Sequence, residues 1–326
     1  MLAMGVPQTM KPYCESLLVD KQRMQKVRRN KLWRWITILL LVVGSESLLA
    51  LGQDLLAWES GGKGDPQITT VSDALADSHG FLTHEVSSSF QAGKTKILVL
   101  IPTDLEIGRK YSVIYILPVE AGTESRYGDG LTEVSKQNLH NNHKVIFVAP
   151  TFSQLPWYAD HPTKPEIRQE AYLLNVVIPF VEKTYPVQAD ADHRLLLGFS
   201  KSGWGAWSLL LRNPDVFGKA AAWDAPLMMD KPGKYGSGEI FGTEENFAKY
   251  RIEKVLRTRS KKLGTGERLI LTGYGNFREE HVRTQALLTE LKIPHVYQDG
   301  PQRKHDWHSG WVAESVELLM QNGKRP

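Results

Sequence analysis

The chain has 326 residues, of which 41% are hydrophobic and 23% are charged, and its formal net charge at pH 7 is +4. This composition supplies enough apolar side chains for one large core or two modest ones and excludes a wholly disordered chain. Much of the basic excess lies before residue 35, so the remainder has no basic groove for nucleic acid. The single cysteine, Cys14, excludes an intramolecular disulfide and a cysteine-based metal site.

The first 52 residues have the pattern of an export signal. Basic residues between positions 21 and 34 lead into the apolar run Leu32–Val43, and the exit Ala50-Leu-Gly52 fits a cleavage site. The apolar run is short for a transmembrane helix, and an uncleaved signal anchor is the alternative. The long stretch before the basic residues raises Met24 as the true start. Either way, we expect the folded part to be secreted or periplasmic, with membrane contact only through an uncleaved N-terminal segment.

A polar, glycine-rich stretch separates this leader from the rest, and we place a linker at 53–79 and a globular domain at 80–326. In the domain, apolar runs that favour strands alternate with segments of helical periodicity. The expected strands are 81–90, 96–101, 111–117, 144–149, 195–197, 220–223, 268–272 and 295–298. The expected helices are 170–181, 205–211, 246–256, 280–291 and 311–320. This alternation predicts an α/β fold, with a mostly parallel sheet, helices on both faces and functional residues after the carboxyl ends of strands.

One turn carries the strongest signal for chemistry. In Arg194-Leu-Leu-Leu-Gly-Phe-Ser-Lys-Ser-Gly-Trp-Gly-Ala206, a short apolar strand ends at Gly198 and a helix follows. Small residues at this place permit a strained turn that presents the hydroxyl of Ser200 above the sheet, as in a nucleophile elbow. The amides at the start of the helix favour developing negative charge, so the N–H of Lys201 is expected to donate to an oxyanion. Ser202 is the rival nucleophile.

The elbow, the order of strands from Phe81 and the ending Lys304-His-Asp-Trp-His-Ser-Gly-Trp311 resemble the alpha/beta-hydrolase esterases of the esterase D type. Feruloyl and acetyl-xylan esterases, S-formylglutathione hydrolase and bacterial mycolyltransferases belong to the same wider group. The resemblance covers about residues 80 to 322 and implies an alpha/beta-hydrolase fold with serine esterase activity. In this group the late histidine stands two residues before a tryptophan, which selects His305 over His308. An imidazole here would accept the serine proton and return one to the leaving group.

The acid departs from the pattern of the group. The resembling esterases carry an aspartate in a Gly-x-x-Asp turn after the strand that corresponds to 268–272, but here Asn276 stands in that place. We prefer Asp224 as the acid because it directly follows the preceding strand, and hydrolases of this fold can supply the acid from there. Glu279 and Glu280 are the alternatives.

The segment that supplies the second oxyanion donor also differs from the pattern of the resembling esterases. A His-Gly turn normally supplies it after the first buried strand, whereas this chain has Pro118-Val-Glu-Ala-Gly122. Because the donor is a main-chain group, the N–H of Val119 or of Glu120 can serve, provided that the carboxylate of Glu120 points away.

Aromatic residues are expected near the mouth of the site, where a sugar or an aromatic acyl group would stack on them. The ones we assign to substrate binding are Trp157, Tyr158, Trp204 and Trp307. No grouping of histidine and acidic residues has convincing metal-ligand spacing, so we expect neither a metal nor another cofactor.

The sequence therefore predicts an exported serine hydrolase that cleaves carboxylic esters through Ser200, His305 and an acid, with an acyl-enzyme intermediate. Its expected substrate is a small-molecule or carbohydrate ester. One alternative is a non-catalytic hydrolase-fold protein that binds carbohydrate or a partner, suggested by Asn276 and the turn after Pro118. Another is an acyltransferase, which shares the chemistry up to the acyl-enzyme.

Overall fold

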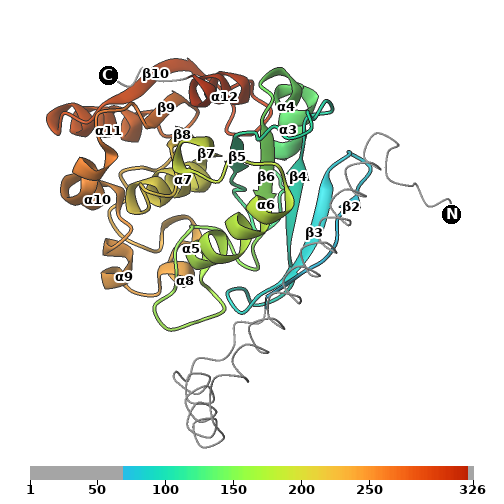
Figure 1. Ribbon diagram of the computed structural model, residues 1–326. Helices are drawn as coiled ribbons and strands as arrows, with labels where there is room; N and C mark the ends of the chain where they lie inside the picture. The colour runs from blue at the N-terminus through green and yellow to red at the C-terminus, as the bar shows by residue number, and fades with distance from the viewer. Residues whose placement is uncertain (1–68, 322–326) are drawn as a thin grey trace, which may run out of the picture. The chain divides into compact units, whose positions relative to one another are not determined.

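A ten-stranded sheet forms the centre of residues 69–321, the part of the chain that the computed structural model describes (Figure 1). Its strand order is β1-β3-β4-β6-β5-β7-β8-β9-β10, and β2 pairs with β3. The strands are β1 Thr70–Val71, β2 Leu75–Ala76, β3 Leu82–Ser87, β4 Thr95–Leu100, β5 Val113–Ile116, β6 Ile146–Pro150, β7 Arg194–Phe199, β8 Lys219–Trp223, β9 Leu269–Tyr274 and β10 His295–Gln302.

The predicted export segment, 1–52, and most of the predicted linker lie outside the described residues. The end of the linker range, from 69 to 79, contributes β1 and β2, which pair in antiparallel fashion with β3. In the described part, the sheet therefore begins about ten residues before the predicted domain start at 80.

Parallel pairing dominates the second half of the sheet. Strands β6, β5, β7, β8, β9 and β10 pair in parallel, whereas β3 pairs with β4 and β4 with β6 in antiparallel fashion. Every residue of β5 and β6 is buried, as expected for strands that are covered on both faces. The predicted α/β class with a mostly parallel sheet is confirmed.

Helices cover both faces of this sheet (Figure 1). One hydrophobic core includes side chains of α5, α6, α7, α10 and α11, and the other includes side chains of α3, α4 and α12. The α-helices are α3 Gly130–Lys136, α4 Leu139–Asn142, α5 Gln169–Tyr172, α6 Ile178–Thr184, α7 Ser200–Arg212, α8 Gly238–Phe241, α9 Glu244–Ala248, α10 Ile252–Arg259, α11 Arg278–Glu290 and α12 Val312–Met320. Shorter helical turns are the π-helical Leu173–Val177 and the 3-10 helices Ala191–His193, Lys234–Gly236 and Ser260–Leu263.

Two predicted helices are divided in the structure. The helix expected over 170–181 consists of α5, a π-helical turn and α6, and the helix expected over 246–256 consists of α9 and α10. Helices α3 and α4 were not predicted, because each spans two turns or fewer and shows no sustained periodicity. The sequence signal that α3 does carry is its N-cap, Asp129, whose carboxylate accepts the N–H of Thr132.

The register of the central strands determines where the functional residues lie. Phe199 at the end of β7 is opposite Trp223 at the end of β8, and Trp223 is opposite Thr272 of β9. Because parallel strands bring their carboxyl ends to one edge, the turns after these three strands meet there.

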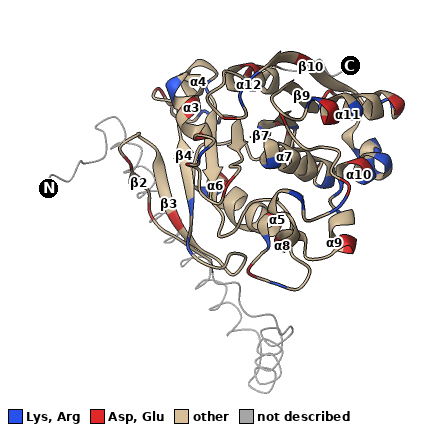
Figure 2. Cartoon of the chain, turned by 180° about the vertical axis from the view of Figure 1, so that it is seen from behind, with Lys and Arg blue, Asp and Glu red and all other residues tan. Residues whose placement is uncertain are grey.

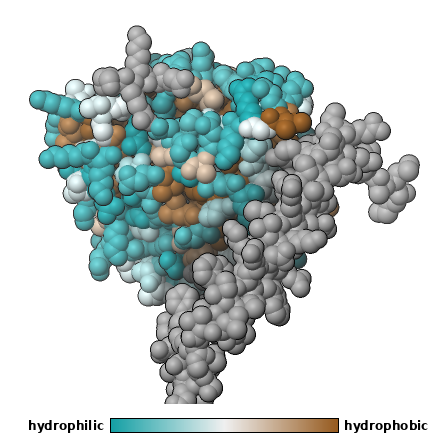
Figure 3. Space-filling view, in the orientation of Figure 1, coloured by the Kyte–Doolittle hydropathy of each residue, from teal (hydrophilic) through white to brown (hydrophobic). Residues whose placement is uncertain are grey.

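Acidic and basic residues are interspersed over the helices, strands and loops of the described part (Figure 2). The face seen in Figure 3 is mostly hydrophilic, with hydrophobic side chains in small groups. Within residues 69–321, no helix combines the length and hydropathy needed to cross a membrane.

Candidate active site

The serine turn between β7 and α7 is strained and tightly packed. Ser200 has a φ of 52°, which is uncommon for a residue other than glycine, and its N–H donates to the carbonyl of Asp224 over 3.1 Å. A Cβ at Gly198 would lie 2.4 Å from the carbonyl oxygen of Ser202, so only glycine fits before the turn. The geometry is that of the predicted elbow, with the hydroxyl of Ser200 at the edge of the sheet.

Ser202 has a structural place in the same turn. Its side chain is fully buried, donates to the carbonyl of Phe199 over 2.9 Å and accepts the Phe199 N–H over 3.1 Å. These two bonds fasten the first turn of α7 to the end of β7. A hydroxyl enclosed in this way cannot reach a substrate, so Ser202 is not the nucleophile.

Three side chains from distant parts of the chain form one line of hydrogen bonds. The Ser200 hydroxyl lies 3.0 Å from His305 Nε2, and His305 Nδ1 lies 2.5 Å from Asp224 Oδ2. With Nδ1–H donating to the carboxylate, Nε2 keeps a lone pair that can accept the serine proton. His308, the alternate base, instead contacts Glu133 over 2.7 Å.

The carboxylate of Asp224 is fully buried at the turn after β8. It accepts the backbone N–H groups of Asn276 and Phe277 over 2.7 to 2.9 Å, in addition to the bond from His305. Burial raises the pKa of this carboxyl, but the bonds from His305 and from the backbone of Gly275, Phe277 and Asn276 outweigh burial and lower it below its ordinary value. Asp224 is therefore ionised at neutral pH.

The turn after β9 receives the acid in this chain. Asn276 contributes its backbone N–H, and a Cβ at Gly275 would lie 2.6 Å from Asp224 Oδ2. The alternative acids are placed elsewhere: Glu280 accepts the N–H of Met228, and Glu279 is exposed in the first turn of α11. Of the three carboxylates considered from the sequence, the structure brings only Asp224 to His305.

A second histidine, His281 of α11, supports the acid turn and was missed in the sequence. It is buried, and its Nε2 accepts the N–H of Ala225 over 2.9 Å. This bond requires a neutral imidazole, and burial lowers the pKa of His281 from 6.5 to about 4. His281 thereby holds Ala225 in place. The preceding residue, Asp224, has a positive φ of 42°.

The two predicted oxyanion donors lie on two segments, the start of α7 and the loop after β5. Lys201 is in the first turn of α7, where helix N–H groups have no acceptor within the helix. The loop that contains Val119 is fixed by two bonds, from the Leu117 N–H to the carbonyl of Leu197 over 2.8 Å and from the Tyr158 hydroxyl to the carbonyl of Pro118 over 2.6 Å.

The side chain of Glu120 is paired with a cation beside this loop. Its Oε1 lies 3.2 Å from Nζ of Lys201. The carboxylate that the sequence analysis required to point away from an oxyanion is thus bound by Lys201.

The assignment of four aromatic residues to substrate binding is wrong. Trp157, Tyr158, Trp204 and Trp307 are each at most 1% exposed. The indoles of Trp157 and Trp204 pack edge to face with centroids 5.4 Å apart, and Trp307 packs against Phe199 at 4.9 Å. These rings fill the core beneath the site because large apolar side chains gain more from burial than from a place at the rim.

Other aromatic rings surround the base. Tyr127 and Phe277 lie 5.5 and 5.8 Å from the ring of His305, and Tyr235 lies 5.7 Å from Phe277. Tyr127 and Phe277 are half-buried and Tyr235 is 50% exposed. The sequence analysis did not single out these three rings, because their approach to His305 depends on tertiary contacts between separate loops.

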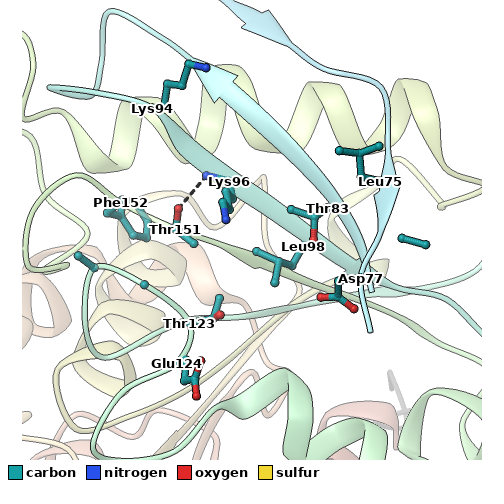
Figure 4. Close-up of a pocket in the computed structure, with 13 residues that line it drawn as sticks. Leu75, Asp77, Thr83, Lys94, Lys96, Leu98, Thr123, Glu124, Thr151 and Phe152 are labelled. Carbon is teal, nitrogen blue, oxygen red and sulfur yellow. Dashed lines mark hydrogen bonds between the residues drawn. The ribbon is translucent and has the colours of Figure 1, made fainter. Parts of the chain in front are cut away.

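A pocket beside the loop after β5 is lined by none of the three bonded residues. Figure 4 shows this pocket. Strands β2, β3 and β4 line it together with residues 121–124 and Thr151 and Phe152. Within residues 69–321, no group of three or more histidine, cysteine or acidic side chains is arranged to hold a metal ion.

The sheet order and the serine turn define the class of protein: an alpha/beta-hydrolase. The family whose description reads "Putative esterase" matches residues 87–231, a segment that contains both Ser200 and Asp224. This part of the chain is therefore similar to the esterases of the predicted group.

Solved structures share the fold at low sequence identity. S-formylglutathione hydrolase FrmB from Staphylococcus aureus has a TM-score of 0.61 and 16% identity, over 77% of this chain and 100% of that one. A ferulic acid esterase has a TM-score of 0.57 and 19% identity, over 78% and 98%. The fluorophosphonate-binding serine hydrolase FphF from Staphylococcus aureus has a TM-score of 0.59 and 16% identity, over 79% and 100%. The predicted alpha/beta-hydrolase fold is confirmed.

The buried His281 predicts a pH dependence of stability. Because its pKa in the folded chain is lower than the ordinary 6.5, the unfolded chain binds more protons between about pH 6.5 and 4. The free energy of unfolding should fall as the pH decreases through this window, by at most about 3 kcal/mol from this group. We expect His281→Asn, whose amide oxygen can still accept a hydrogen bond, to lack this part of the decrease in urea titrations.

The matched control is His79→Asn, because His79 is exposed. It should keep the pH dependence of the unmodified chain. Equal slopes for the unmodified chain and His281→Asn between pH 6.5 and 4 would contradict the role given to His281.

Proposed function

We propose that this chain is a serine esterase in which Ser200, His305 and Asp224 act as a catalytic triad. The observation that carries the proposal is the continuous line of hydrogen bonds from the Ser200 hydroxyl through the imidazole to a buried carboxylate. In the first step, Ser200 Oγ attacks the ester carbonyl carbon while His305 Nε2 takes the hydroxyl proton. Asp224 stabilises the imidazolium that forms and holds the ring in the required tautomer.

The carbonyl oxygen becomes an oxyanion as the new bond forms. The N–H groups of Val119 and Lys201 are the proposed donors, since Lys201 lies in the first turn of α7 and Val119 lies on the loop after β5, which the Glu120–Lys201 ion pair joins to that turn. The half-positive charge at the start of α7 adds to the stabilisation.

The intermediate then collapses and releases the alcohol. His305 returns its proton to the leaving oxygen, which leaves the acyl group on Ser200. Water attacks this acyl-enzyme as His305 accepts one of its protons, and the acid is released while Ser200 regains its hydrogen. An alcohol in place of water would give acyl transfer by the same steps.

Ser200→Ala tests the assignment of the nucleophile. We expect the hydrolysis of p-nitrophenyl acetate to fall at least about 1,000-fold, because no other hydroxyl lies within reach of His305 Nε2 among the described residues. Ser208→Ala is the matched control: Ser208 is a buried serine of the same helix without a hydrogen-bond partner among these residues, and its variant should keep the activity.

Circular dichroism should show that both variants retain the fold. A Ser200→Ala variant that is folded and as active as the unmodified chain would refute the mechanism. The product of the unmodified chain should be the free acid. If an added alcohol is converted to a new ester as fast as the free acid forms, the chain is an acyltransferase.

The substrate we propose is an acyl group attached to a carbohydrate. His305 must deliver its proton to the leaving alcohol, so the rings beside His305 border the place where the alcohol lies. Phe277 and the exposed Tyr235 offer apolar ring faces to the C–H groups of a sugar. Tyr235 has a φ of 54°, a backbone conformation that is uncommon for residues other than glycine.

Tyr235→Asn tests the carbohydrate proposal, because asparagine tolerates a positive φ while removing the ring. We expect kcat/KM for an acetylated xylose to fall about 3- to 10-fold, and kcat/KM for methyl acetate to stay the same. Ile107→Ala, at a fully exposed apolar residue, is the control and should change neither value. An equal effect of Tyr235→Asn on both esters would contradict a sugar subsite.

Export is proposed from the pattern of the first 52 residues, which lie outside the described part of the chain. Expression of the full chain in a bacterial host should yield a product that begins after Gly52, outside the cytoplasm, as found by fractionation and N-terminal sequencing. Leu40→Arg, which places a charge in the apolar run, should block export. A full-length product in the membrane fraction would support the signal anchor, and one in the cytoplasm would refute export.

A further inference from the structure

The loop after β5 has hydrogen bonds at its two ends, and between them the buried side chain of Val119 packs in the core. At the first end, the N–H of Leu117 donates to the carbonyl of Leu197, and the carbonyl of Pro118 accepts the hydroxyl of Tyr158. At the other end, the carbonyl of Ala121 accepts the N–H of Phe152 over 2.8 Å. Val119 and Glu120 lie between these anchors, and we find no acceptor for their N–H groups within residues 69–321. This free backbone is the part of the loop that would face an oxyanion.

The second half of the loop, residues 121–124, borders a pocket. Residues 121–124 line the pocket of about 570 Å³ that β2, β3 and β4 complete (Figure 4). At Gly122, the nearest atom to an added Cβ would be a carbonyl oxygen of the same loop, 3.8 Å away. The loop therefore has room to shift in the direction of the pocket unless another contact restrains it.

The ion pair of Glu120 and Lys201 is such a contact. Lys201 Nζ lies 3.2 Å from Glu120 Oε1, and the two side chains are 12% and 31% exposed. Burial lowers the pKa of Lys201, and the neighbouring carboxylate of Glu120 acts in the opposite direction. Partial burial reduces screening by water, so this pair is stronger than an ion pair on the open surface.

The position of the pair in the chain is what gives it a function. Lys201 directly follows the nucleophile and carries one oxyanion donor on its backbone, while Glu120 directly follows Val119, which carries the other. A single contact between side chains thus joins the two segments whose N–H groups must converge on one oxygen atom. Oxyanion donors act only within about 2.7 to 3.1 Å of that oxygen, so a small shift of either segment weakens them.

We propose that the Lys201–Glu120 ion pair is a positioning device that holds the two oxyanion donors at their working separation. The proposal rests on the proposed function, because it assigns the pair to the oxyanion site of the same reaction. The pair does not touch the reacting atoms in this role. It acts on the transition state through the backbone, so its loss should lower kcat and leave KM nearly unchanged.

The test uses Glu120→Gln, Lys201→Met and the double variant of the full chain. We expect each single variant to lower kcat for p-nitrophenyl acetate about 10- to 100-fold, with KM changed less than threefold. The rate of Ser200 labelling by a fluorophosphonate, which forms a tetrahedral adduct, should fall in parallel. The kcat of the charge-swapped variant E120K/K201E should be at least about tenfold higher than that of either single variant.

The matched control is the ion pair of Lys94 and Glu85, which has a similar length of 3.0 Å but is 70% and 54% exposed. Glu85→Gln should change neither kcat nor labelling. The double variant E120Q/K201M contains no unpaired buried cation, so it gives the same test if Glu120→Gln alone does not fold.

Three results would overturn the proposal. The first is an unchanged kcat in folded Glu120→Gln. The second is a loss that appears only in KM and only for charged esters, which would place the pair in substrate binding. The third is a charge swap with no recovery. If the fluorophosphonate labels Ser200 equally fast in the unmodified chain and in Glu120→Gln, the positioning role of the ion pair is refuted and the proposed function stands. If the unmodified chain is never labelled, the proposed function is refuted as well.

Discussion

The site depends on the parallel register of β7, β8 and β9. Phe199, Trp223 and Thr272 are neighbours across the sheet, so the turns after these strands start at the same level. Two of these turns open with a residue of positive φ, Ser200 and Asp224, and the N–H of Ser200 donates to the carbonyl of Asp224. The backbone bond couples the strained turns, so neither relaxes without the other. The nucleophile and the acid thus keep a fixed relation before their side chains interact through His305.

Moving the acid by one strand changes which groups must support it. In the resembling esterases, the acid is part of the turn after β9. Here Asp224 follows β8, and its carboxylate lies against the turn after β9 and bonds to His305. The loop adapts by offering N–H groups and by having Gly275, where any side chain would collide with the carboxylate. Asn276 is therefore compatible with ester hydrolysis, because its main chain and not its side chain takes part. His281 completes the support by bonding to the residue after the acid.

The sequence was informative about residues whose place follows from local motifs and from their order along the chain. It was uninformative about whether an aromatic side chain is buried or faces a substrate. The approximate positions of strands β3 to β10, and the candidates Ser200 and His305, follow from local patterns and from their order, and Asp224 follows from the strand that precedes it. The four aromatic residues assigned to the mouth lie in the core, since a tryptophan near a functional motif looks the same in sequence whether it faces a substrate or a helix. Phe277 and Tyr235 are near His305 only through tertiary contacts between separate loops.

The loop after β5 shows how a residue that looks unfavourable in the sequence is accommodated. A carboxylate beside an oxyanion would raise the energy of the transition state if it were alone, by repulsion that a low-dielectric site strengthens. Its pairing with Lys201 makes the local charge close to zero, so the field at the oxyanion comes mainly from the N–H groups and the helix. In the proposed mechanism, this neutral pair leaves the proton transfer to His305 and joins the loop to the start of α7. The proposed donors on the two segments would then converge on one oxygen without the usual His-Gly turn.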